Sequence, residues 1–149
     1  KTEGDIYSSP AVSDGVIYFG SNDDNLYAIN SRTGRLVWKF QTEGLVSSSP
    51  AVSDGIIYFG SYDNHLYAVD SKSGNEKWRF ETGGKVYSPV VARGIIYFGS
   101  NDDHLYAVNS VTGEELWKVK TDDSVDSSPS IANGTLYFGS WDGNLYAVE

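Results

Sequence analysis

Short apolar runs separated by tight polar turns recur along the whole chain, beginning with the stretch from Val16 to Ile29. This stretch starts with apolar residues, passes through the polar turn Asn22 to Asn25, and becomes apolar again at Leu26. Two apolar runs joined by a short polar turn are typical of a β-hairpin. The pattern occurs four times, and the other copies are Ile56 to Val69, Ile95 to Val108 and Thr135 to Val148.

Three independent markers show that these hairpins belong to a longer repeat of about 40 residues. The four prolines (Pro10, Pro50, Pro89 and Pro129) and the four Phe-Gly-Ser triplets recur at nearly constant intervals. Three tryptophans, Trp38, Trp78 and Trp117, follow the same period. A fixed period of this size indicates a repeat architecture.

Each repeat contains signals for four short β-strands. Turn sequences such as Asp14-Gly15 separate them, and glycine accepts the positive φ that a tight hairpin turn requires. No stretch has the 3.6-residue period of an amphipathic helix, so we expect essentially no helix. In the first repeat the expected strands are Ser8 to Val12, Val16 to Ser21, Leu26 to Ile29 and Leu36 to Gln41.

The alternation of side chains predicts how these strands are covered. In the last strand of the repeat, Leu36, Trp38 and Phe40 alternate with other residues, so we expect these three on one buried face. The strand from Val16 to Ser21 is apolar on both faces, which is expected of a strand covered on both sides. Repeated four-stranded antiparallel units of about 40 residues predict an all-β fold, a β-propeller.

We therefore interpret the chain as one propeller domain, residues 1–149, with four blades. The last blade is expected to have three strands, and the whole to form half of an eight-bladed ring. The approximate blade boundaries are 5–43, 44–83, 84–122 and 123–149.

A second motif follows three of the hairpins: Ala-x-Asp/Asn-x-x-Thr/Ser-Gly-x-x-x-Trp, at Ala28 to Trp38, Ala68 to Trp78 and Ala107 to Trp117. It resembles the tryptophan-docking motif of the PQQ-like repeat, the propeller family named after pyrroloquinoline-quinone enzymes. The resemblance implies that the tryptophan of one blade packs against the neighbouring blade, in rings of seven or eight blades outside the cytoplasm. The residues that carry this expected docking are Trp38, Trp78, Trp117, Gly34, Gly74 and Gly113.

The repeat is interrupted at the two ends of the sequence. Glu149 is equivalent to Asn30, while Lys1 to Gly4 matches Gln41 to Gly44, so the positions equivalent to 31–40 are missing between them. We expect two chains to close into one ring as a homodimer of four plus four blades; a closed four-bladed monomer is the alternative. The sequence has no signal peptide, so a mature domain, an excised fragment and an engineered half-propeller all remain open.

Charge and composition narrow the functions further. The net charge of −9 argues against binding nucleic acid or an anionic membrane, because both need clustered Lys and Arg. No apolar run is long enough to cross a bilayer. The absence of cysteine excludes disulfides, thiol nucleophiles and cysteine-based metal sites.

The turns between the two middle strands carry the only candidate ligand residues. His65 and His104 occupy equivalent places on adjacent blades, each beside an aspartate, Asp63 and Asp102. They could form a site for a cation or small ligand on one rim of the propeller. The alternative is that they are ordinary turn residues, because aspartate stabilises tight turns.

Two functions from different classes follow. The first is a non-catalytic scaffold that binds protein partners, with no cofactor; here the chain resembles the propeller lipoprotein of the outer-membrane β-barrel assembly machinery. The second is a fragment of a quinone-dependent dehydrogenase. The resemblance implies that such enzymes carry cofactor and Ca²⁺ ligands and an adjacent cysteine pair in long insertions, whereas this chain has no cysteine. Serines of the first strand of each repeat have no recurring histidine or lysine beside them, which argues against a serine nucleophile.

Overall fold

The computed structural model describes all residues from 1 to 149 and contains fifteen strands and no helix. The strands form four separate antiparallel sheets, one for each repeat. The first sheet contains β1 (Ala11–Ser13), β2 (Val16–Ser21), β3 (Asn25–Asn30) and β4 (Leu36–Gln41). The second contains β5 (Ala51–Ser53), β6 (Ile56–Gly60), β7 (His65–Asp70) and β8 (Glu76–Glu81). The third contains β9 (Val90–Ala92), β10 (Ile95–Ser100), β11 (His104–Asn109) and β12 (Glu115–Lys120). The fourth contains β13 (Ser130–Ala132), β14 (Thr135–Gly139) and β15 (Leu145–Val148).

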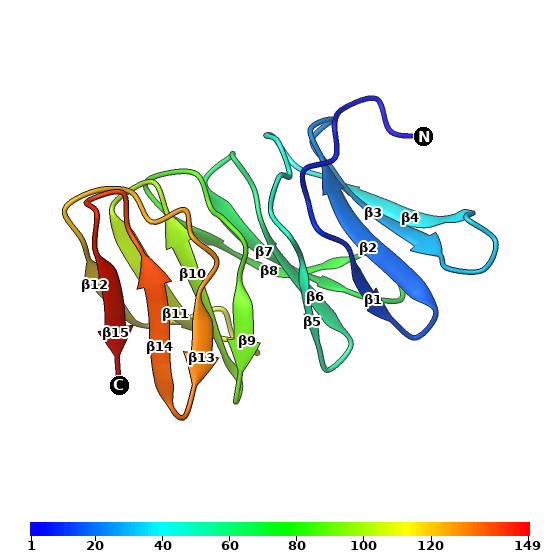
Figure 1. Cartoon of the computed structure of the whole chain (residues 1–149). Coiled ribbons are helices and arrows are strands. Elements are labelled where there is room, and N and C mark those ends of the chain that lie inside the picture. Colours follow the sequence, from blue (N-terminus) through cyan, green and yellow to red (C-terminus); the bar gives the residue numbers. More distant parts are fainter.

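The sheets are stacked face to face as the blades of an open arc (Figure 1). Short strands line the inner side of the arc, where β1 contacts β5 and β5 contacts β9. The first and fourth blades lie at opposite ends, with the two termini far apart (Figure 1). The chain is therefore a four-bladed half-propeller, and not the closed four-bladed ring that the sequence left as an alternative.

The hairpin turns follow from their residues. Asp14 and Gly15 both have positive φ, 48° and 76°, as the two-residue turn between β1 and β2 requires. The turns between the two middle strands of the first three blades also contain one left-handed residue, Asp24, Asn64 or Asp103. Aspartate and asparagine tolerate this conformation better than other side chains do.

Two local expectations from the sequence were wrong. The first strand begins at Ala11 and not at Ser8, because the residues before Pro10 make hydrogen bonds to other parts of the propeller instead of to β2. Leu36 is 56% exposed and does not share the buried face of Trp38. A β-bulge separates them: Ala28 pairs with Trp38 and Ile29 with Leu36, which leaves Val37 as an extra residue.

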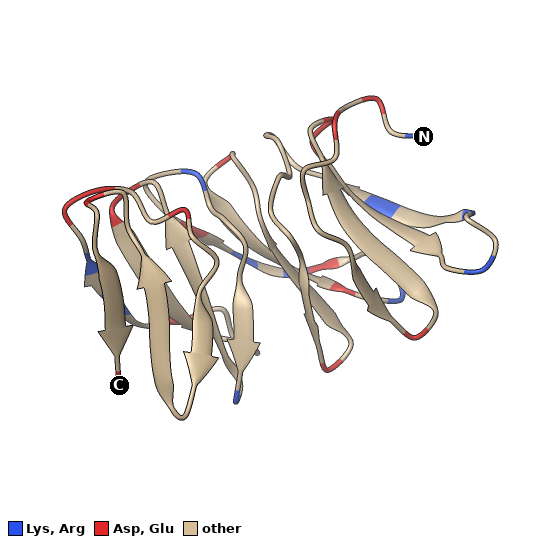
Figure 2. Ribbon diagram, in the orientation of Figure 1, with Lys and Arg blue, Asp and Glu red and all other residues tan.

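The apolar core lies between blades rather than inside them. Three clusters of buried side chains fill the three internal seams, each built from one face of a blade and the opposing face of the next. Acidic residues gather along the rim formed by the turns between middle strands and the connections between blades (Figure 2). No helix in the structure has the length and apolar character to cross a membrane.

Candidate functional site at the blade seams and the acidic rim

Each seam is built from the same positions of the repeat. Between the first two blades, Tyr18 and Leu26 pack against Val46, Phe59 and Tyr67, and all five are almost completely buried. The Tyr18 hydroxyl also donates a hydrogen bond of 3.2 Å to the carbonyl oxygen of Ser71. The seam between the second and third blades repeats these contacts, with Tyr58 bound to Ser110.

The predicted docking tryptophans lie at the outer part of these seams. The Trp38 indole N–H donates to the carbonyl oxygen of Ser71 at 3.0 Å, and that of Trp78 donates to Ser110 at 3.3 Å. Each tryptophan thus joins the last strand of one blade to the turn before the last strand of the next. Its ring adds a tilted contact with the tyrosine of its own blade, with 5.8 Å between the ring centroids of Trp38 and Tyr18.

Glycine in that turn lets the tryptophan approach. Gly74 has φ of +71°, and a Cβ on it would lie 2.7 Å from Cδ2 of Trp38. Gly113 has the same relationship to Trp78. Both the backbone conformation and the contact therefore favour glycine.

Two of the six predicted docking residues lack the complete docking contact seen at Trp38 and Trp78. Gly34 has open space around it, and a Cβ added there would have no atom of another residue within 4 Å. Trp117 packs against Tyr97 at 5.7 Å between ring centroids and against the third core cluster, but its indole N–H makes no hydrogen bond. Gly34 lies on the uncovered side of the first blade, whereas Trp117 lies in the third seam, where the fourth sheet has only three strands and no turn equivalent to that of Ser71.

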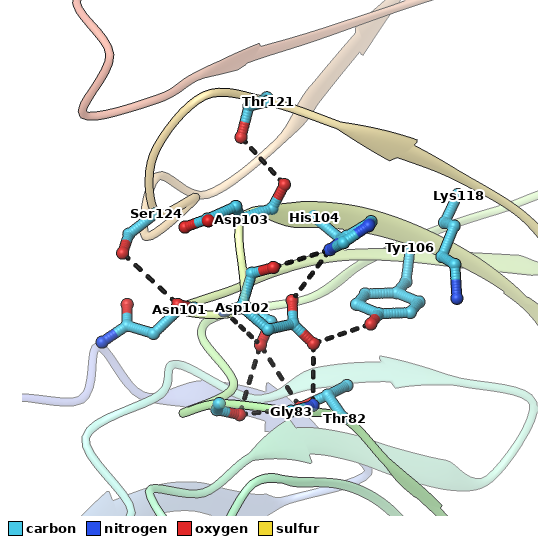
Figure 3. Close-up of polar contacts among 12 residues, drawn as sticks. Thr82, Gly83, Asn101, Asp102, Asp103, His104, Tyr106, Lys118, Thr121 and Ser124 are labelled. Carbon is cyan, nitrogen blue, oxygen red and sulfur yellow. Dashed lines mark hydrogen bonds and ion pairs between the residues drawn. The ribbon is translucent and has the colours of Figure 1, made fainter.

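The acidic rim contains a polar motif that the sequence analysis missed. In each blade an aspartate of the turn accepts hydrogen bonds from a tyrosine hydroxyl four residues later and from a backbone N–H of the connection before the blade. In the third blade, Asp102 Oδ2 accepts from Tyr106 at 2.7 Å and from the Gly83 N–H at 2.7 Å (Figure 3). Lys118 lies over the same tyrosine ring, 5.4 Å from its centroid. The other three pairs are Asp23 with Tyr27, Asp63 with Tyr67 and Asp142 with Tyr146.

These contacts change the acidity of the groups. Burial and the hydrogen bond to Asp23 raise the pKa of Tyr27 to about 12. Burial and the adjacent aspartate raise the pKa of Tyr67 and of Tyr106 still further. Partial burial opposes ionisation of Asp23, but its hydrogen bonds, led by that from Tyr27, outweigh this effect and lower its pKa.

The two histidines are bound within their own turns. His65 Nδ1 lies 2.9 Å from the carbonyl oxygen of Asp63, and His104 Nδ1 lies 2.7 Å from that of Asp102 (Figure 3). In the first blade Asn25 makes the same contact through its side-chain amide, at 2.6 Å. The structure forms two separate Asp–His pairs and does not gather three or more metal-binding side chains at one place.

Serines on the inner side of the arc join neighbouring blades. Ser49 Oγ accepts a hydrogen bond from the Ser9 N–H, and Ser88 Oγ accepts one from the Ser49 N–H, both at 2.9 Å. Ser48 Oγ instead accepts from the Gly60 N–H of its own blade. These hydroxyls therefore act in the connections between strands and blades.

The most unusual surfaces of the molecule are the two terminal blade faces. On the fourth blade, Leu145 is 77% exposed, whereas its equivalents Leu26, Leu66 and Leu105 are 0% exposed. On the first blade, Ile6 is 51% exposed, whereas its equivalents are 0% exposed. Those equivalents are Val46, Val86 and Val125.

Gly139 on the fourth blade lacks the neighbour that its three equivalents have. In the first three blades the glycine of the second strand lies directly against the valine of the next blade, so that a Cβ would overlap the valine carbonyl. Gly139 is the fourth copy, and a Cβ there would meet only the side chain of Ser127, at 3.8 Å. The two terminal faces thus leave uncovered the positions that are buried at the three internal seams. The three closed contacts are Gly20 with Val46, Gly60 with Val86 and Gly99 with Val125.

The surface grooves are less distinctive. One groove of about 330 Å³ lies beside the docked Trp78 and is lined by Asp54, Tyr58, Ser110 and Val111. Its aromatic walls are the seam residues described above. It therefore belongs to the packing between the second and third blades.

The fold and these seams define a class of protein: a half-propeller of PQQ-like repeats. A family model described as outer membrane protein assembly factor BamB matches residues 2–88 and again residues 81–149. The chain belongs to this family. A search of the curated proteins gave no match.

Solved structures show the same fold at low sequence identity. The computationally designed Ika4 protein is 16% identical, with a TM-score of 0.89 over 99% of this chain and 92% of its own. BamB from Moraxella catarrhalis is 20% identical, with a TM-score of 0.88 over 99% of this chain and 48% of BamB. The quinohemoprotein alcohol dehydrogenase ADHIIG from Pseudomonas putida HK5 is 21% identical, with a TM-score of 0.82 over 94% of this chain and 29% of that enzyme. The chain thus spans about half the length of BamB.

Proposed function

We propose that the protein is a non-catalytic scaffold in which two copies pair through their terminal faces to close one eight-bladed ring. The observation that carries this proposal is the exposure of Leu145, a residue whose three equivalents are completely buried. An exposed apolar face of this kind is unfavourable in water, and covering one leucine contributes about 1.5–3 kcal/mol.

The occupant proposed for this face is the first blade of a second copy, because the chain itself contains the matching surface. Ile6 stands where Val46, Val86 and Val125 cover the glycine of the preceding blade. That face also carries the partly exposed side chains of Phe19, Tyr27, Ile17 and Ile29, whose equivalents are buried in the first internal seam: Phe59, Tyr67, Ile57 and Val69. A two-fold pairing forms this contact twice, so both ends of both arcs are covered.

The structural likenesses support this arrangement. The arc superposes on about half of BamB and on 45% of the chain of the designed Ika8 protein, so its curvature suits a propeller of twice its length. Ika4 has about the same length as this chain and the same fold, which supports a separate half-propeller as a unit, natural or engineered.

The chemistry of the acidic rim also supports a structural role without catalysis; in our proposal, protein partners of the scaffold would bind at the rims. The aspartates Asp23, Asp63, Asp102 and Asp142 are all engaged by tyrosine hydroxyls and backbone N–H groups. They hold the connections between blades in place. The quinone-dependent dehydrogenase and a cation-binding or small-ligand-binding propeller remain the alternative functions, and no contact in the structure favours either.

The substitution Leu145→Asp tests the pairing directly. We expect sedimentation to show one chain for this variant and two for the unchanged protein, because a charge would be buried at both seams. Val111→Asp is the matched control: Val111 is equally exposed but stands on a turn where the other repeats have Arg32 and Lys72. Far-ultraviolet circular dichroism checks that both variants are folded. A folded Leu145→Asp variant that still forms pairs would contradict the proposal.

A further inference from the structure

One pair of positions on the acidic rim makes a different contact at each of the first two seams. It joins the first residue of the turn between the middle strands of one blade to the connection that leads into the next blade. At the first seam both residues are polar, and Ser47 Oγ donates to Asn22 Oδ1 at 2.8 Å. At the second seam both are aromatic: the rings of Tyr62 and Tyr87 meet edge to face, 5.9 Å apart.

The same position carries aromatic residues at the two ends of the arc. Trp141 is the fourth-blade equivalent of Asn22 and Tyr62, and it is 69% exposed. Tyr7 is the first-blade equivalent of Ser47 and Tyr87, and it is 72% exposed. The first and fourth blades lie at opposite ends of the arc, so these two residues cannot meet within one chain (Figure 1).

We propose that Trp141 packs against Tyr7 of a second copy, so that an aromatic pair closes the rim at each of the two seams of the ring. This inference rests on the pairing proposed above. Its precedent is the Tyr62–Tyr87 contact, in which Lys85 also lies over the Tyr62 ring, 4.5 Å from its centroid. Aromatic pairs in this geometry add affinity beyond the area that they bury, and Trp and Tyr are the residues that most often dominate binding energy at interfaces.

The pair would act together with the apolar contact beside it. Tyr7 directly follows Ile6, the residue that we place against Gly139 of the second copy, and Trp141 lies two residues after Gly139. In the proposed pair Ile6 therefore closes the seam between the sheets, and the aromatic pair at the rim fixes the position of Ile6. The backbone supports this placement, because the Trp141 N–H is already held by the carbonyl oxygen of Ser124 at 2.9 Å.

Affinity measurements on substituted proteins test this inference. Because the contact is made twice, we expect Trp141→Ala and Tyr7→Ala each to raise the dissociation constant of the pair by about tenfold or more. The double variant should have about the same dissociation constant as the weaker-binding single variant, because either change alone removes the whole contact. Trp141→Tyr should restore affinity to within about threefold, because it recreates the pair found at the second seam. Val111→Ala on the opposite rim is the control and should change nothing.

Cross-linking gives a second readout that does not depend on affinity. The chain has no cysteine, so Tyr7→Cys combined with Trp141→Cys offers only two thiols. A short bis-maleimide should link two chains in this variant but not in one that combines Tyr7→Cys with Val111→Cys.

The outcomes separate the two proposals. A single-chain mass for the unchanged protein would overturn the pairing itself. A two-chain mass with unchanged affinity in both alanine variants, or without cross-linking, would overturn the aromatic contact alone.

Discussion

The indole N–H of Trp38 lies 3.0 Å from the carbonyl oxygen of Ser71, across the boundary between the first and second blades. The Tyr18 hydroxyl donates to the same oxygen, so one carbonyl receives two side chains from the preceding blade. Blades of this protein share no backbone ladder between their sheets. Side-chain contacts of this kind therefore hold the arc together, along with single backbone hydrogen bonds such as that from the Val46 N–H to the Ser21 carbonyl oxygen at 3.1 Å.

The tryptophan contact predicts a difference between two equivalent residues. Trp38→Ala should lower the free energy of unfolding by about 3–5 kcal/mol, since it removes both the packed ring and the hydrogen bond. Trp117→Ala should cost clearly less, because the Trp117 N–H has no partner on another blade. Chemical denaturation of both variants measures the difference. Equal losses would show that the cross-blade contact contributes nothing.

Gly74 and Gly34 provide a matched pair for the turn beneath the tryptophan. Both have positive φ, so alanine at either position has a backbone cost of about 1–2 kcal/mol. At Gly74 the new Cβ would also overlap the Trp38 ring, which should add about 1–3 kcal/mol. Thermal or chemical unfolding should therefore show Gly74→Ala as the less stable variant. Similar values for the two would mean that the ring moves away without cost.

The rim motif predicts that a single hydroxyl is important for stability. Tyr67→Phe should lower the free energy of unfolding by about 1.5–3 kcal/mol, because it removes a hydrogen bond of 2.8 Å to the Asp63 carboxylate. Tyr97→Phe is the control, since Tyr97 packs in the third internal seam and its hydroxyl makes no hydrogen bond. Denaturant titration distinguishes them. No loss in Tyr67→Phe would show that water replaces this bond freely.

The rim tyrosines also predict instability in alkali. The pKa of Tyr27 is raised to about 12 in the folded protein, against about 10 in an unfolded chain. A raised pKa means that its stabilising effect is complete below about pH 10 and is lost as the pH rises towards about 12. The pKa values of Tyr67 and Tyr106 are raised in the same direction. The free energy of unfolding should thus fall steeply over this range, and phenolate absorbance should rise together with unfolding. Full ionisation of these tyrosines in a folded protein would contradict this.

Much of the fold could be predicted from the sequence because the repeat supplies four copies of each signal. The strands Val16–Ser21 and Leu36–Gln41 have the predicted bounds. The position of Leu36 could not be predicted, because alternation assumes a regular strand and the bulge at Val37 shifts every earlier residue to the other side. Bulges have no reliable pattern in a single sequence.

The candidate site was harder to predict for a different reason. The spacing of Asp63 and Tyr67 recurs in all four blades and could have been noticed in the sequence. Its meaning depends on the backbone N–H of Glu43, which reaches the same carboxylate from the connection between blades at 3.0 Å. Histidine is a common ligand, so His65 and His104 were candidate binding residues, yet Asn25 makes the same turn contact through its side-chain amide. Only the folded chain shows that these positions are interchangeable.

The proposed pairing makes the uncovered faces around Leu145 and Ile6 two halves of one seam. Light scattering on the 149-residue chain tests it most directly, by measuring the molar mass in solution. We expect the mass of two chains, each of 16.3 kDa. A single-chain mass together with one cooperative thermal transition would contradict it, because the open arc would then be stable with both faces in water.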